Sequence, residues 1–214
     1  TFTKVIREIT VAAKMGGTDA SSNSRLRLAL SKANASNVPK DTVKRAIDKA
    51  SGQNNENFEE ITYEGYGPKG IAVIVECLTD NKNRTVSDLR HLLSKHGGSL
   101  GTNGSVSHLF RKVGIMKLND ISEDDLIEHM ESIDIEDFEM IDSGCIIFTK
   151  PTELFSTKKY FESKSINVIE EEIIMDPLTS IDVSKEDSEK ISDLSNKIEE
   201  LDDVQNVYMN SNLT

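Results

Sequence analysis

The feature of this sequence that most constrains its fold is a short apolar run at residues 71–78, IAVIVECL. The run is rich in β-branched residues and follows a glycine-punctuated turn that includes Gly65, Gly67 and Gly70. It therefore predicts a buried β-strand. A polar corner at residues 79–85 follows the run and separates it from the next element.

An amphipathic helix is predicted after this corner, because Val86, Leu89 and Leu93 fall on one helical face. Residues 97–104, GGSLGTNG, then turn the chain back into a predicted strand near residues 106–110. The order strand, helix, strand indicates a layered α/β domain.

Residues 2–52 predict three helices, and the polar residues 53–60 predict a linker after them. Pro39 suits the first turn of the third helix, and Gly52 ends it. Each helix has an apolar face, formed by Phe2, Val5, Ile6, Ile9 and Ala13, by Leu26, Ala29, Leu30 and Ala33, and by Val43, Ala46, Ile47 and Ala50. A small three-helix bundle is the expected arrangement.

A second layered domain is predicted for residues 112–178. Its elements follow in the order strand (113–118), helix, two paired strands, helix, strand, which is the ferredoxin-like plan. Ser122 and Asp125 form a capping box for the first of these helices.

The last helix and strand that the sequence predicts cannot fold alone, so we expect them to return to the first α/β domain. The predicted fold class is α+β: an N-terminal three-helix bundle, residues 1–53, followed by two ferredoxin-like α/β domains. Residues 112–178 form the domain that is inserted into the other, which residues 60–111 and 180–210 build together.

Several segments of this chain resemble the YebC family. They are residues 2–14 (FTKVIREITVAAK), residues 37–41 (NVPKD), residues 79–85 (TDNKNRT) with the flanks 64–76 and 97–110, and residues 202–208 (DDVQNVY). The architecture of that family implies a helical domain and an α/β domain that is interrupted by a second α/β domain. Bacterial members are described as transcriptional regulators, and relatives in bacteria and mitochondria act in translation, so the resemblance implies a regulator of gene expression.

Charge is distributed unevenly along the chain. The net charge of −12 argues at first against a nucleic-acid partner. However, residues 1–53 carry ten Lys/Arg and four Asp/Glu, a net charge of +6, whereas the rest of the chain carries −18. Residues 112–178 alone carry −11. Since an acidic surface repels phosphates, we expect the helical end to lead any contact with nucleic acid.

The candidate nucleic-acid-binding residues are the basic side chains of the helical end and two residues of the polar corner. Asn81 and Arg84 are included because side chains gather where a strand meets a helix, and a guanidinium suits a phosphate. The alternatives are a solvated helix face for the first group and a helix cap for the second. The helical candidates are Lys4, Arg7, Lys14, Arg25, Arg27, Lys32, Lys40, Lys44, Arg45 and Lys49.

Nothing in the sequence demands an enzyme. The histidines lie outside metal or nucleophile motifs, and Cys77 and Cys145 sit in apolar runs that predict buried free thiols. The spacing Gly98-x-x-Gly101-x-x-Gly104 could cradle a phosphate, but it precedes a strand rather than a helix, which favours an ordinary turn. We therefore predict no catalytic residue, no metal site, no cofactor and no small-molecule substrate. The four histidines are His91, His96, His108 and His129.

The absence of an apolar run of about 18 residues predicts that the chain does not span a membrane, and we expect a cytoplasmic protein. The predicted function is a non-enzymatic, nucleic-acid-binding regulator of gene expression that acts on DNA. The alternative is a ribosome-associated translation factor that contacts rRNA or tRNA, because an acidic body with a small basic end suits a large RNA–protein surface. A third reading is an acidic protein-interaction module.

Overall fold

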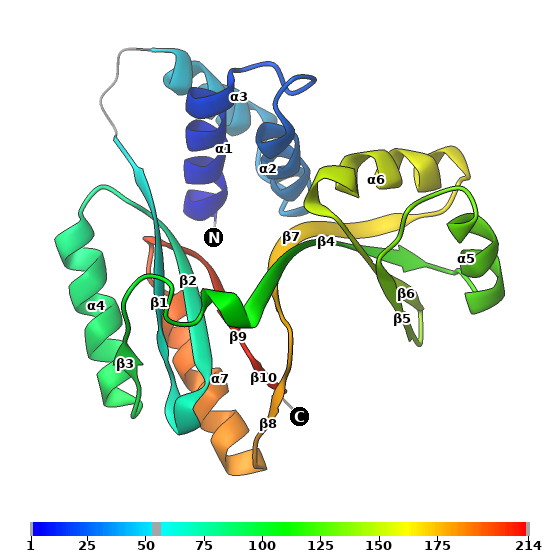
Figure 1. The fold of residues 1–214 in the computed structure, drawn as a ribbon. Helices are drawn as coiled ribbons and strands as arrows, with labels where there is room; N and C mark the ends of the chain where they lie inside the picture. Colours follow the sequence, from blue (N-terminus) through cyan, green and yellow to red (C-terminus); the bar gives the residue numbers. More distant parts are fainter. Residues whose placement is uncertain (1, 53–56, 213–214) are drawn as a thin grey trace. The chain divides into compact units, whose positions relative to one another are not determined.

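The computed structural model describes residues 2–52 and 57–212 (Figure 1). The chain forms two compact units. One combines Thr1–Phe110 with Pro177–Thr214, and the other is Arg111–Asp176. The finer division into three domains, with residues 1–53 separate, stays a prediction.

The N-terminal helices are α1 (Phe2–Gly16), α2 (Ser24–Ala35) and α3 (Lys40–Ser51). Asn23 joins α1 to α2, because its Oδ1 accepts a hydrogen bond from Leu26 N and its Nδ2 donates to Ala12 O and Gly17 O. The helices share one apolar cluster, which consists of Ile9, Ala12, Ala13, Leu26, Ala29, Ala33, Val38 and Ala46. The small side chains of this cluster allow close packing of three short helices.

The first sheet has the strand order β3-β1-β2-β9, and each neighbouring pair is antiparallel. Its strands are β1 (Glu59–Tyr66), β2 (Ala72–Thr79), β3 (Ser99–Leu100) and β9 (Val204–Met209). The helices α4 (Lys82–Lys95) and α7 (Lys185–Glu199) cover one face of the sheet. The C-terminal helix and strand therefore return to this domain, as predicted.

Strand β1 corrects the sequence prediction at Gly65 and at the end of the linker predicted for residues 53–60. The rest of the turn predicted at residues 65–70 is present, because Pro68–Gly70 form a 3₁₀ turn. Residues 53–56 of that linker lie outside the described residues, and Glu59 begins β1. Gly65 lies inside this strand, and the position requires glycine because β3 approaches it closely. A Cβ at Gly65 would lie 2.6 Å from Ser99 O. This glycine serves a close backbone approach rather than a turn.

The strand predicted near residues 106–110 is also wrong. Ser107–Leu109 form a 3₁₀ turn, and a single strand, β4 (Phe110–Asn119), follows it. The amides of Val106 and Ser107 donate to the Glu64 side chain. They therefore do not join a strand ladder.

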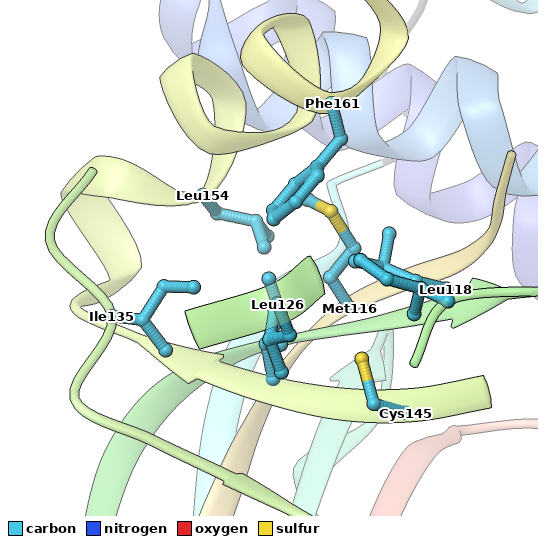
Figure 2. Packing of buried hydrophobic residues seen from close by; sticks show 9 residues of the cluster. Met116, Leu118, Leu126, Ile135, Cys145, Leu154 and Phe161 are labelled. Atoms are coloured by element: carbon cyan, nitrogen blue, oxygen red, sulfur yellow. The ribbon is translucent and has the colours of Figure 1, made fainter. Parts of the chain in front are cut away.

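The second unit contains a sheet of strand order β5-β6-β4-β7 with two helices. Its further elements are α5 (Glu123–Met130), β5 (Asp137–Ile141), β6 (Gly144–Thr149), α6 (Leu154–Ser163) and β7 (Val168–Pro177). Figure 2 shows its core, in which Met116 and Leu118 from β4 face Leu126 of α5 and Phe161 of α6. The predicted ferredoxin-like order of elements is present. Two short strands outside this unit, β8 (Ile181–Asp182) and β10 (Ser211–Asn212), pair in parallel.

Deletion of residues 111–176, with a short Gly/Ser linker in their place, is expected to leave a protein that unfolds cooperatively. The physical reason is that Leu178 N donates to Leu109 O at 2.9 Å, so the two ends of the excised segment already meet. A short linker therefore adds little loop-closure entropy. Urea denaturation followed by circular dichroism measures this, with a second linker of twice the length as control. A broad transition with both linkers would contradict the prediction.

Candidate nucleic-acid interface

The polar corner after β2 is built around the buried carboxylate of Asp203. Arg84 Nη2 donates to its two oxygens at 2.8 and 2.9 Å, and Arg84 Nε donates at 3.1 Å. Arg7 Nη1 donates from α1 at 3.1 Å, and Thr85 Oγ1 donates at 2.9 Å. The side chain of Asp203 is only 7% exposed, so these donors hold its charge inside the protein.

The electrostatics of Asp203 follow from these contacts. Burial alone would raise the pKa of its carboxyl, but hydrogen bonds from Arg84, Thr85 and Arg7 lower the pKa below its ordinary value. Asp203 therefore remains charged and ties α1 to the α/β domain.

Arg7 has further internal partners. Its guanidinium donates to Asp202 O at 2.9 Å and Leu78 O at 3.3 Å, and it lies 4.7 Å from the centre of the Phe58 ring. A phosphate would have to displace these groups to reach Arg7. The structure thus gives this predicted contact an internal role.

The corner residue Asn81 caps α4, because its Oδ1 accepts from Arg84 N at 3.1 Å. Beside it opens a cavity of about 400 Å³. Four aspartates and two arginines line this cavity, so its formal charge is negative and does not favour a phosphate. The lining residues are Arg7, Asp80, Arg84, Thr85, Asp88, Leu201, Asp202 and Asp203.

Four other predicted cations make contacts inside the molecule. Lys4 Nζ donates to Glu199 O, and Lys14 Nζ donates to Asn57 Oδ1 at 3.0 Å. Arg25 pairs with Glu8 at 2.7 Å and with Glu60 at 2.6 Å, and Arg27 donates to Ala20 O at 2.8 Å and Ser21 O at 3.0 Å. These cations therefore connect α1 and α2 to each other, to the end of α7 and to residues around β1.

The remaining candidates lie on α2 and α3. Lys32 is half-buried on α2, and Lys49 is exposed near the end of α3. Lys40, Lys44 and Arg45 are exposed on α3, and we refer to these three as the α3 basic face.

Within residues 2–52 and 57–212, no carboxylate forms an ion pair with the α3 basic face. The side chain of Arg45 contacts only its own helix, at Asp41 O (3.2 Å) and Thr42 Oγ1 (3.5 Å). Asp41 and Asp48 lie on the same helix, so α3 as a whole keeps an excess of two positive charges. The α3 basic face is thus exposed, and its cations have no carboxylate partner within residues 2–52 and 57–212.

The glycine-rich loop at residues 97–104 has an internal anion. The carboxylate of Glu64, a buried residue of β1, accepts from the amides of Gly104 (2.5 Å), Ser107 (2.6 Å) and Val106 (3.0 Å). The backbone of Glu64 also accepts from Gly101 N at 2.8 Å. The loop is therefore the turn that its position favoured, and its amides bind a carboxylate of the same chain rather than a phosphate.

Sequence reasoning missed Glu64, because neither strand β1 nor the burial of this acid was visible in the sequence. In the folded protein a buried acid needs hydrogen-bond donors, and the loop amides supply them. Burial alone would raise the pKa of Glu64, but the amides of Gly104, Val106 and Ser107 lower it.

We expect Glu64→Gln to lower the free energy of unfolding by about 2 kcal/mol at pH 7, because the new amide nitrogen cannot accept from the loop amides. Since the folded pKa is depressed, the contribution of Glu64 is present above the ordinary pKa of 4.5 and is lost as the pH falls below it. Urea denaturation at pH 7 and pH 3 measures both effects. Glu59→Gln, on the same strand but exposed, is the matched control; an equal loss in both variants would contradict the prediction.

Other chemistry is sparse in the described part of the chain. Burial raises the pKa of Cys77 to about 12 and that of Cys145 to about 11, so both thiols stay protonated. Residues 2–52 and 57–212 contain no group of three His, Cys, Asp or Glu side chains that could hold a metal ion. No helix among them has the length and apolar character needed to cross a bilayer.

The sequence matches two models of one protein family. Residues 1–53 match the family model described as the TACO1/YebC protein N-terminal domain, and residues 58–211 match the TACO1/YebC second and third domain. Relatives from Francisella philomiragia (46% identical) and Acidithiobacillus ferrooxidans (45%) are each named "Probable transcriptional regulatory protein". The alignments cover all of this chain and 87% and 86% of those relatives.

A solved structure shows the same fold. It is the crystal structure of a conserved hypothetical protein from Aquifex aeolicus, 40% identical, with a TM-score of 0.89. The superposition covers all of this chain and 89% of that one.

Proposed function

The chain belongs to the TACO1/YebC family, and from this premise we propose that it regulates gene expression by binding nucleic acid through the α3 basic face. The observation that carries the proposal is that Lys40, Lys44 and Arg45 are exposed on one helix and form no ion pair with a carboxylate of the described residues. Clustered cations of this kind contact the phosphate backbone without reading sequence.

The interface is smaller than the sequence predicted, because several of the other candidate residues form ion pairs within the protein. Arg7 and Arg84 stabilise Asp203, and Arg25 pairs with two glutamates. We therefore assign these three residues to the stability of the fold, and we assign phosphate contact to α3. No step of the proposed activity requires catalysis or a cofactor.

DNA is the first target to test, because relatives of this chain are named probable transcriptional regulatory proteins. A cytoplasmic regulator of this kind would contact duplex DNA mainly through its phosphates, since the α3 basic face consists only of Lys and Arg side chains.

Structured RNA, including that of the ribosome, is the second candidate. It is favoured by the size of the basic face, because a helix of 12 residues is only about 18 Å long. The chain outside residues 1–53 carries a net charge of −18. A folded RNA can present its phosphates to so small a basic surface, whereas an extended duplex approaches more of the acidic protein.

Titration of a labelled duplex DNA and a labelled RNA hairpin, followed by fluorescence anisotropy at 50 to 200 mM salt, tests the proposal. With about three phosphate contacts, we expect the logarithm of the affinity to fall with the logarithm of the salt concentration with a slope of about −2 to −3. A slope near zero, or no binding of either probe at the lowest salt, would contradict it.

A further inference from the structure

A small cavity lies between α2 and α3, directly beside the α3 basic face. It has a volume of about 160 Å³ and is lined by Leu30, Ala33, Asn34, Val38, Lys40 and Val43. Four of these side chains are aliphatic. Leu30 and Val43 are half-buried, whereas Ala33 and Val38 belong to the buried apolar cluster of the helices. Asn34 and Lys40 are exposed, so the cavity combines apolar walls with a polar rim.

The turn between the two helices, which contributes Val38 to the cavity, is fixed by backbone hydrogen bonds. Val38 N donates to Ala33 O at 2.9 Å, and Ser36 N donates to Lys32 O at 2.9 Å. Asn37 adopts a left-handed backbone conformation with φ of 54°, which asparagine tolerates better than most residues. This segment belongs to the stretch NVPKD, residues 37–41. Of these residues, only Lys40 is part of the α3 basic face.

The start of α3 adds a second feature to the same place. Pro39 precedes the helix and offers no side-chain cap, and only the amides of Thr42 and Val43 donate back to Pro39 O. An uncapped helix start attracts anions. Asp41 in the same turn weakens that attraction, so Lys40 and Lys44 must supply most of the charge for a phosphate.

We propose that the cavity between α2 and α3 receives one unpaired base of an RNA strand, while the adjoining phosphates contact Lys40 and Lys44. This inference rests on the proposed function and names its substrate class. Aliphatic walls suit the faces of a base, and the Asn34 amide can both donate to and accept from a base edge. The aliphatic side chains alone would suit any apolar ligand. The cations beside the cavity favour a ligand that also carries a phosphate.

The shape of the site distinguishes an unpaired nucleotide from a duplex. A base inside a duplex is stacked and cannot enter a concave site unless it leaves the helix. Proteins that read RNA bind mainly the splayed bases of loops and bulges. The cavity therefore assigns an RNA loop or bulge, rather than duplex DNA, as the preferred target of α3.

The test compares RNA hairpins that carry a single bulged base, with each of the four bases in turn, with a fully paired hairpin of the same stem. Wild-type protein is expected to bind at least one bulged hairpin about tenfold more tightly than the paired one. Asn34→Leu fills the mouth of the cavity without offering an aromatic ring for stacking. It is expected to abolish this preference without changing affinity for the paired hairpin. Ala35→Leu, one residue further along α2 and also exposed, is the matched control and should keep the preference.

A hairpin with 2-aminopurine at the bulge gives a direct reading of the base environment. We expect its fluorescence to change on binding to the wild type and to Ala35→Leu but not to Asn34→Leu. Equal affinity for bulged and paired RNA, or an unchanged preference in Asn34→Leu, would overturn the inference and leave the proposed function standing. Equal affinity for a bulged DNA hairpin would overturn the assignment to RNA, and no binding of any probe would overturn the proposed function itself.

Discussion

Replacement of Lys40, Lys44 and Arg45 together by Ala is expected to lower the affinity for nucleic acid roughly 100-fold at 100 mM salt and to reduce the salt slope by about 2 to 3. The physical reason is that these exposed cations make the phosphate contacts, and each contact releases counterions. Their removal should leave the free energy of unfolding nearly unchanged, because no carboxylate in the described chain pairs with them. Fluorescence anisotropy and urea denaturation measure the two quantities.

The matched control removes the same number of positive charges elsewhere. Lys69, Lys150 and Lys190 are exposed, and each pairs with a surface carboxylate, so their replacement by Ala should change stability little. Affinity should stay within about threefold of the wild type, since only the general field of the protein changes. Equal losses in the two triple variants would show that net charge, rather than the α3 basic face, determines binding.

Asp203→Asn is expected to lower the free energy of unfolding by about 3 kcal/mol at pH 7. The variant keeps the size of the side chain but leaves Arg7 and Arg84 facing a neutral amide, and the side chain of Arg7 is itself only 17% exposed. Because Arg7 belongs to α1 and Asp203 precedes β9, the loss should also weaken the attachment of α1 to the α/β domain. Urea denaturation and amide hydrogen exchange of α1 measure these effects.

The pH dependence of this variant follows from the depressed pKa of Asp203. A lowered folded pKa means that the stabilisation is present above the ordinary value of 3.8 and is lost as the pH falls below it. Wild type and Asp203→Asn should therefore differ at pH 7, and the difference should shrink as the pH falls below 3.8. Asp202→Asn, an exposed neighbour that contacts Arg7 through its backbone oxygen, is the control; if it lost as much stability as Asp203→Asn, the cluster would not be the cause.

Much of the fold was predictable, because its elements have strong local patterns. The three N-terminal helices have apolar faces of helical period, and residues 71–78 form an apolar run that a surface helix could not contain. Strand β1 was not predictable in the same way. Its one glycine, Gly65, resembles a turn glycine, and the close approach of Ser99 that requires it is a tertiary contact.

The candidate site was predictable only as a region. A count of basic residues located the helical end correctly as the positive part of the chain, but it could not show which cations already have partners. Asp203 lies far along the chain from both Arg7 and Arg84, and no pattern in one sequence connects them. Lys40, Lys44 and Arg45 differ from both arginines in pairing, and from Arg7 also in burial. Both are properties of the folded protein.

The central claim is that the protein acts on nucleic acid through α3, and sedimentation in a cell lysate tests it most directly. Wild type and the Lys40/Lys44/Arg45→Ala variant would be run on sucrose gradients, each untreated, treated with RNase or treated with DNase. We expect the wild type to sediment faster than free protein, to return to the top after RNase but not after DNase, and the variant to remain at the top throughout. Fast sedimentation of the wild type that neither nuclease removes, or equal sedimentation of both proteins, would contradict the claim.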